Sequence, residues 1–186
     1  PSEGGRTILS IGNFDGVHQA HRHICRQIRE AAAERGGRSA ILTFDPHPLS
    51  VVAPERCPPF MTTLEEKLAR LAARGVDLTV VQPFTPELAR MEPGDFVRKI
   101  VHEKLCPDIV FVGFNFHYGK GAAGNVELLR REGGKWGFET REIEAFMAGG
   151  QRVSSSAIRR LLLAGNVDEA STLLGGYHVI EGPVVR

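Results

Sequence analysis

The chain is poor in cysteine and has no long apolar run. Its three cysteines, Cys25, Cys57 and Cys106, are widely spaced and form no CxxC pair, which argues against a disulfide framework and a structural zinc site. No stretch of about 18 apolar residues occurs, and the first residues lack the basic-then-apolar pattern of a signal peptide. We therefore expect a soluble protein of the cytoplasm.

The chain also lacks an excess of either charge. Its 23 Lys and Arg residues stand against 22 Asp and Glu residues, so there is no global positive field to attract nucleic acid. No GxGxxG motif follows the first apolar run, and the Gly-Lys-Gly at 119–121 lacks the spacing and the Ser/Thr of a P-loop. We expect no nucleic-acid or membrane partner, and we exclude a dinucleotide-binding oxidoreductase and a P-loop kinase.

Short apolar runs rich in β-branched residues alternate along the chain with longer stretches of helical period. This alternation is typical of βαβ units around a parallel sheet, and 186 residues at 42% hydrophobic composition suffice for one core. The expected fold class is therefore α/β with a parallel sheet. The predicted strands span residues 7–11, 39–44, 78–82, 109–113 and 139–143.

Capping residues and glycines mark the expected helices. The first helix should run from about His18 to Arg35, with Gly36 and Gly37 supplying a left-handed stop. Thr63 and Glu66 form a capping box. The remaining signals are Pro93 as a helix start, Ser155 or Ser156 as the cap of a helix through Leu163, and Asn166 as the cap of another through Leu174.

The strongest candidate site lies where the first strand meets the first helix, in the sequence GNFDGVHQAH at 12–21. The start of a helix attracts phosphate, and glycines let a ligand approach the backbone. His18 and His21 are three residues apart, so both imidazoles lie on one face of the first turn. Ordinary surface or capping histidines are the alternative, and a zinc site is weaker because no third ligand is evident nearby.

Four ordered segments resemble the motifs of prokaryotic FAD synthetases. The segment at 12–21 resembles the HxGH signature GNFDGVHxGH, 43–48 resembles TFDPHP, 112–119 resembles VGxDFxFG, and 153–159 resembles ISSTxIR. The resemblance covers about residues 7–175. It implies a Rossmann-like sheet of the HxGH nucleotidyltransferase type and an enzyme that transfers AMP from ATP to FMN, with Mg²⁺ accompanying ATP.

The resemblance also implies site residues at the matching positions. The implied catalytic residues are His18, His21, Ser155 and Arg159. The implied ATP-binding residues are Gly12, Asn13, Phe14, Asp15, Gly16, His18, His21, Ser154, Ser155, Ser156 and Arg159. The implied flavin-binding residues are Phe44, Pro46, His47, Pro48, Phe96, Asn115, Phe116, Tyr118 and Gly119. No metal ligands are predicted.

Without the family resemblance, several of these residues also fit simple structural roles. Phe44 and Phe116 also suit a hydrophobic core, and the serines before Arg159 also suit a simple helix cap. Ala20 replaces the glycine of HxGH, and its methyl group is expected to crowd the nucleotide and weaken its binding. The alternatives are an adenylyltransferase for another phosphorylated precursor, such as phosphopantetheine or nicotinamide mononucleotide, and a catalytically weak module that binds FMN or ATP.

The last residues of the chain show a different sequence pattern from the α/β pattern before them. Residues 1–175 are predicted to form the adenylyltransferase domain, and residues 176–186 a linker and the first strand of a riboflavin kinase module. Family members of this type are usually bifunctional, with that module following the first domain. We therefore expect the kinase module in the full-length protein and no riboflavin kinase activity in this chain.

Overall fold

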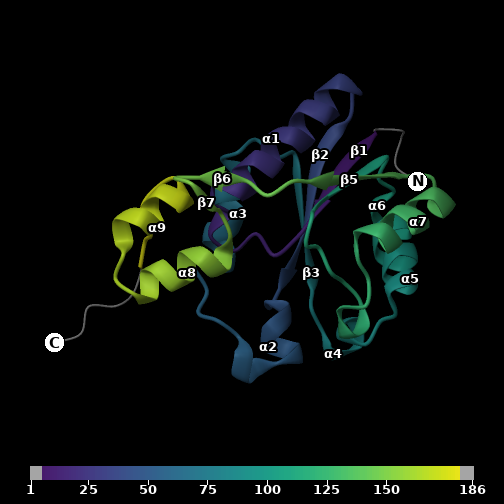
Figure 1. Ribbon diagram of the computed structural model, residues 1–186. Helices are drawn as coiled ribbons and strands as arrows, with labels where there is room; N and C mark the ends of the chain where they lie inside the picture. The colour runs from purple at the N-terminus through teal and green to yellow at the C-terminus, as the bar shows by residue number, and fades with distance from the viewer. Residues whose placement is uncertain (1–5, 181–186) are drawn as a thin grey trace.

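A computed structural model describes residues 6–180 and shows a parallel five-stranded sheet with helices on both faces (Figure 1). The strand order is β3-β2-β1-β4-β5, and all four strand pairs are parallel. The strands are β1 (Thr7–Ile11), β2 (Arg38–Asp45), β3 (Leu78–Pro83), β4 (Ile109–Gly113) and β5 (Glu139–Ile143). All five predicted strands are confirmed, with β2 and β3 slightly longer than expected.

Helices lie between successive strands of the sheet, and two more follow the last strand. They are α1 (Gln19–Glu34), α2 (Pro48–Val52), α3 (Leu64–Ala72), α4 (Pro86–Ala89), α5 (Pro93–Phe96), a π-helical turn η3 (Val97–His102), α6 (Glu103–Leu105), α7 (Val126–Trp136), α8 (Ser155–Leu163) and α9 (Val167–Leu174). Short 3₁₀ turns lie at Asp15–Val17, Pro54–Arg56 and Lys120–Ala122. His18 caps α1, Gly36 takes the left-handed conformation, and the capping box of Thr63 and Glu66 is present.

The structure corrects one predicted cap and adds elements that the sequence did not predict. Ser154 caps α8, rather than Ser155 or Ser156, because its hydroxyl oxygen accepts a hydrogen bond from the Ala157 N–H at 3.2 Å. The unpredicted elements are α2, α4, α7 and the hairpin of β6 (Met147–Ala148) and β7 (Gln151–Arg152). Two glycines inside α7 weaken its helical signal, yet Gly133 is needed there because a Cβ would lie 2.6 Å from the Phe138 carbonyl oxygen.

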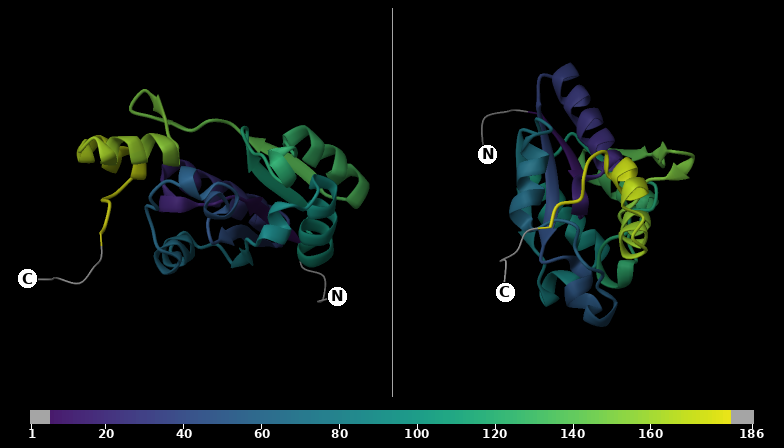
Figure 2. Two further views of the ribbon diagram at one scale, coloured as in Figure 1. Left: turned by 90° about the horizontal axis from the view of Figure 1, so that it is seen from below. Right: turned by 90° about the vertical axis from the view of Figure 1, so that its left-hand side faces the viewer.

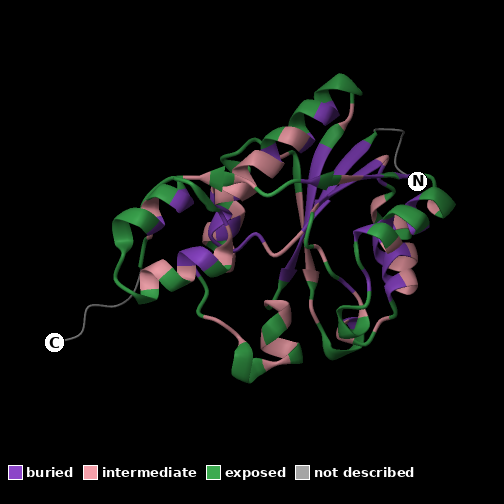
Figure 3. Cartoon of the chain, viewed as in Figure 1, coloured by how far each residue is buried: buried purple, intermediate pink, exposed green. Residues whose placement is uncertain are grey.

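The central strands of the sheet are buried, as their purple colour in Figure 3 shows, and side chains alternate between the two faces of a strand. One face packs its apolar side chains, among them Ile8, Ile41 and Ile109, against α1 and α3. The other face packs Leu9, Leu42 and Val110 against α4 to α7. Burial on both faces explains why β1, β2 and β4 read as largely apolar runs.

The last two helices form a separate cluster at one side of the sheet, away from α7 (Figure 2). Ile158 of α8 and Leu173 of α9 are fully buried in it, together with Met61 from the segment before α3. This cluster holds the start of α8 beside the start of α1, so residues from both ends of the chain meet there.

The predicted β segment at the end of the chain receives no support from its described part. Residues 177–180 form no strand, and residues 181–186 lie outside the described residues. The domain boundary near residue 175 stays a prediction. In the span from 6 to 180, none of the helices has the length and apolar character needed to cross a membrane.

Candidate functional site

The topology places the candidate site at the carboxyl edge of the sheet. From β1 the chain first winds to one side, through β2 and β3, and then to the other, through β4 and β5. The loops that follow β1 and β4 therefore diverge and leave a crevice between them, which is where open α/β sheets bind ligands. A cavity of about 580 Å³ lies at this edge, lined by residues from both loops.

Most of the predicted flavin residues line this cavity. They are Phe44, Pro48, Phe96, Asn115, Phe116, Tyr118 and Gly119. The aromatic rings contact one another in a series, with ring centroids 6.5 Å apart for Phe44 and Phe96, 5.5 Å for Phe96 and Tyr118, and 5.4 Å for Phe116 and Tyr118. Phe44 is only 9% exposed, so it belongs to the core and to the cavity wall together.

Several cavity residues were not predicted from the sequence, and most of them lie on helices that were not predicted either. Leu49 and Val52 lie on α2, Leu88 and Ala89 lie on α4, and Phe84 precedes α4. Pro46 and His47 do not line the cavity, although both were predicted to bind flavin. His47 instead caps α2 and contacts the Asn13 side-chain nitrogen at 3.2 Å through Nε2.

The two histidines of the first motif stack on each other. The ring centroids of His18 and His21 are 3.7 Å apart, with 12° between the ring planes. His21 lines the same cavity as the aromatic residues, together with Gly12, Asn13 and Phe14 from the same motif. The nucleotidyltransferase motif and the aromatic wall therefore face one cavity.

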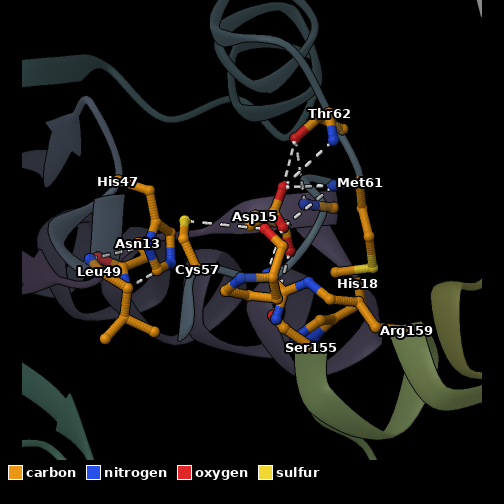
Figure 4. Close-up of polar contacts among 12 residues, drawn as sticks. Asn13, Asp15, His18, His47, Leu49, Cys57, Met61, Thr62, Ser155 and Arg159 are labelled. Carbon is orange, nitrogen blue, oxygen red and sulfur yellow. Dashed lines mark hydrogen bonds and ion pairs between the residues drawn. The ribbon is translucent and has the colours of Figure 1, made fainter. Parts of the chain in front are cut away.

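His18 connects the first loop to α8 through a short chain of hydrogen bonds (Figure 4). Its Nδ1 accepts a hydrogen bond from the His21 backbone N–H at 3.4 Å, so in the neutral ring Nε2 carries the proton. That Nε2 donates to the Ser155 hydroxyl oxygen at 3.2 Å, and the same hydroxyl donates to the Asp15 carbonyl at 3.3 Å. Ser155 is thus fixed beside His18, although neither residue lines the cavity.

Both histidines are neutral in the free protein at physiological pH. Burial lowers the pKa of His18 from 6.5 to about 4, and the Asp15 carboxylate offsets only part of this effect. Burial also lowers the pKa of His21 well below its usual value, with the neighbouring His18 acting in the same direction. The site therefore presents the two rings as neutral hydrogen-bond donors rather than as fixed cations.

The lowered pKa of His18 predicts a specific loss of stability in acid. The unfolded chain takes up a proton at His18 near pH 6.5 and the folded chain only near pH 4, so acidification through this window favours unfolding. We expect His18 to contribute a loss of about 3 kcal/mol in the free energy of unfolding across the window. Urea unfolding of the wild type and of His18→Gln at several pH values would measure the difference. The exposed His117, replaced by Gln, serves as a control, and an unchanged pH dependence in His18→Gln would contradict the expectation.

A buried lysine that was not predicted lies beneath the site. Lys67 is 8% exposed, and its ammonium group donates to the Phe44 carbonyl at 3.2 Å and to the Asn13 carbonyl at 3.4 Å. It joins the ends of β1 and β2, which carry the two halves of the cavity wall. One sequence signal was available, because Lys67 occurs in the apolar stripe formed by Leu64, Leu68 and Leu71.

Three further residues that were predicted to bind ATP lie in different surroundings. Ser156 is exposed and makes no side-chain hydrogen bond within residues 6–180. Gly16 adopts φ 81°, and a Cβ there would lie 2.9 Å from the Met61 side chain, so glycine is required for the backbone. Asp15 pairs with Arg159 in the interior.

Ala20 does not line the cavity. Its side chain packs against the cluster formed by α8, α9 and Met61. The sequence predicted that this methyl group would crowd the nucleotide, whereas the structure gives it a packing role at the helix junction. The departure from the HxGH glycine is therefore accommodated within the protein.

This packing changes the result expected for Ala20→Gly. Loss of helix propensity costs about 1 kcal/mol, and loss of the packed methyl group adds to it. We expect a lower melting temperature with ATP affinity and turnover unchanged within about twofold. Thermal unfolding and steady-state kinetics on the same preparation would measure both. Tighter ATP binding in the glycine variant would show that the methyl group does crowd the nucleotide.

Comparison with known proteins identifies the family. Residues 1–157 match the FAD synthetase family. The chain belongs to this family. It is 35% identical over all 186 residues to the bifunctional riboflavin kinase/FMN adenylyltransferase of Escherichia coli K12, of which it covers 59%. A putative enzyme of the same description from Geobacillus thermodenitrificans is 36% identical, with 91% of this chain and 89% of the relative covered.

The chain thus spans less than two thirds of the E. coli relative, and the same holds for a Listeria monocytogenes relative with 33% identity and 57% coverage of its length. Among solved structures, a macrolide-efflux protein from Streptococcus pneumoniae matches with a TM-score of 0.82 over 95% of this chain and 67% of that chain. At 22% identity, that likeness shows the shared Rossmann-like α/β fold alone.

Proposed function

We propose that this FAD synthetase family member is an FMN adenylyltransferase, which joins FMN to the AMP part of ATP. The observation that carries the proposal is the single cavity lined both by His21 with Gly12 to Phe14 and by the aromatic wall of Phe44, Phe96 and Tyr118. An aromatic wall suits a planar ring such as isoalloxazine, and a glycine-containing loop before a helix suits phosphate. The two substrates of the reaction would then meet at this edge of the sheet.

In the proposed reaction, an oxygen of the FMN phosphate attacks the α-phosphorus of ATP. The bond from that phosphorus to the oxygen bridging to the β-phosphate breaks, and pyrophosphate leaves. A phosphate monoester with a second pKa of about 6 is already largely dianionic at pH 7, so neither a protein nucleophile nor a general base is needed. The protein must place the two anions in line and stabilise the charge that develops on pyrophosphate.

The residues at the phosphate end suit this task. His21 lines the cavity beside the start of α1, whose first N–H groups are donors. In the free protein His18 donates to Ser155 and the Ser155 hydroxyl donates to the Asp15 carbonyl, so a phosphate oxygen would replace these acceptors on binding. Arg159 supplies a positive charge from α8. We propose these four side chains as the catalytic residues, with Asn115 and the aromatic residues orienting the flavin.

Mg²⁺ enters this proposal as part of the substrate MgATP. Within residues 6–180 no group of three His, Cys, Asp or Glu side chains is arranged to hold a metal ion. Asp15, the acidic side chain of the first loop, already accepts hydrogen bonds from Met61, Thr62 and Arg159. The ATP phosphates are hard oxygen ligands of the kind that Mg²⁺ prefers.

Incubation of the chain with FMN, ATP and Mg²⁺, followed by chromatography, tests the function. We expect FAD and pyrophosphate from FMN. We expect no FAD from riboflavin, because riboflavin lacks the attacking phosphate. Parallel reactions with phosphopantetheine and nicotinamide mononucleotide examine the other precursors. A folded chain that forms no FAD from FMN would remove the assignment.

We also propose a riboflavin kinase module in the full-length protein, by analogy with the names of the relatives.

A further inference from the structure

The Asp15 carboxylate is buried and divides its two oxygens between different parts of the chain (Figure 4). Oδ1 accepts hydrogen bonds from the Thr62 backbone N–H at 3.2 Å and from the Thr62 hydroxyl at 3.1 Å. Oδ2 accepts a short hydrogen bond of 2.5 Å from Nη2 of Arg159. The Met61 N–H lies 3.1 Å from both oxygens. Asp15 therefore joins the first loop to the segment before α3 and to α8.

The pair of Asp15 and Arg159 lies in the interior, with side chains only 7% and 12% exposed. A buried ion pair contributes little net stability, because the cost of removing both charges from water offsets their attraction. Arg159 also keeps a buried Nε with no hydrogen-bond partner within the described residues. A guanidinium group that is held on one side and has an unused donor is arranged for a further acceptor.

Asp15 contacts α8 a second time through its backbone. The Ser155 hydroxyl donates to the Asp15 carbonyl at 3.3 Å, and Ser155 precedes Arg159 by one helical turn. The same hydroxyl lies 3.2 Å from the His18 Nε2. One residue therefore fixes Ser155 and Arg159 of α8 relative to the histidines of the first loop.

We propose that Asp15 is a positioning residue that sets the location of Arg159 for the nucleotide phosphates and does not itself bind ATP. The proposal rests on the proposed function, since it takes ATP as the ligand, and it replaces the ATP-contact role expected from the sequence. Every oxygen of the Asp15 carboxylate already has donors from the protein, and a carboxylate facing a polyphosphate would repel it. Its charge acts through the guanidinium that it holds.

The variant Asp15→Asn tests the contact with Arg159 separately from the contacts with Met61 and Thr62. An asparagine can keep Oδ1 toward Met61 and Thr62, which places its amide nitrogen toward Arg159. Two donors then face each other and Arg159 moves. We expect the Kd for ATP to rise by about 10-fold or more, while the Kd for FMN changes by less than about twofold.

Thr62→Val is the matched control. It removes the hydroxyl that donates to Asp15 and accepts from the Gly16 N–H, and it leaves the pair of Asp15 and Arg159 in place. We expect lower thermal stability with an unchanged Kd for ATP. Equal weakening of ATP binding by both variants, or no weakening by Asp15→Asn, would overturn the proposal.

A double-mutant comparison decides the question even if Asp15→Asn alone folds poorly. The combination Asp15→Asn/Arg159→Met removes both charges, so neither is left unpaired in the interior. If Asp15 acts through Arg159, the double variant should bind ATP as weakly as Arg159→Met alone. A further loss in the double variant would mean that Asp15 contributes by another route. Calorimetric ATP binding does not depend on FAD formation, so a wild type that binds ATP and makes no FAD would remove only the proposed function.

Discussion

Replacing His21 or His18 with alanine is expected to lower the turnover of FMN and ATP to FAD by about 10² or more. The His18 ring is held by hydrogen bonds and the His21 ring stacks on it, and the removal of one donor from such a preorganised site typically has an effect of this size. His21 is the cleaner of the two tests, because it lines the cavity and the hydrogen bond of the α1 cap uses its backbone N–H rather than its ring. Initial rates at saturating FMN and MgATP would measure the effect.

His18→Ala should in addition lower stability, since it removes the cap of α1 and the partner of Ser155. His23→Ala is the control. His23 lies in the same helix, two residues after His21, but its ring contacts Arg26 and Phe146 instead of the cavity. We expect unchanged turnover in that variant. Normal turnover in His21→Ala with FAD formation by the wild type would return His21 to a purely structural role, and normal turnover in His18→Ala would do the same for His18.

The fold could be predicted because its signals are local. The strands β1, β4 and β5 have the bounds that the sequence predicts, and the spacing of His18 and His21 already places both on one helical turn. The carboxyl edge of a parallel sheet then brings the loops after β1, β2 and β4 together. Phe44, Asn115 and Tyr118 reach one cavity for this reason.

The missing parts of the site depend on contacts between distant residues. Asp15 and Arg159 are 144 positions apart, and nothing in either motif indicates that they pair. The neutral state of His18 follows from burial beneath α8, which the sequence does not measure. The helices α2 and α4 are too short for a periodic signal, so the cavity residues that they contribute were not predicted.

The two ends of the cavity differ in chemistry, which allows flavin binding to be disturbed without disturbing ATP. The aromatic end is built from α2, α4, α5 and the loop after β4, whereas the phosphate end is lined by Gly12 to Phe14 and His21. Ser155 of α8 contacts His18 beside this end but does not line the cavity. Ala89 is a small residue of α4 that lines the aromatic end. A large planar side chain at this position would occupy the space that we assign to isoalloxazine.

Ala89→Trp is therefore expected to raise the Kd for FMN by about 100-fold, or ~2.7 kcal/mol, and to leave the Kd for ATP within about twofold of the wild type. Titration of FMN fluorescence and calorimetry with MgATP measure the two affinities separately. Ala33→Trp, on the exposed side of α1, is the control for the effect of an added indole on the fold. Unchanged FMN affinity in Ala89→Trp would place the flavin outside this cavity. An equal loss of ATP affinity would show instead that the nucleotide extends into the aromatic end, because α4 contributes no residue to the phosphate end that we propose.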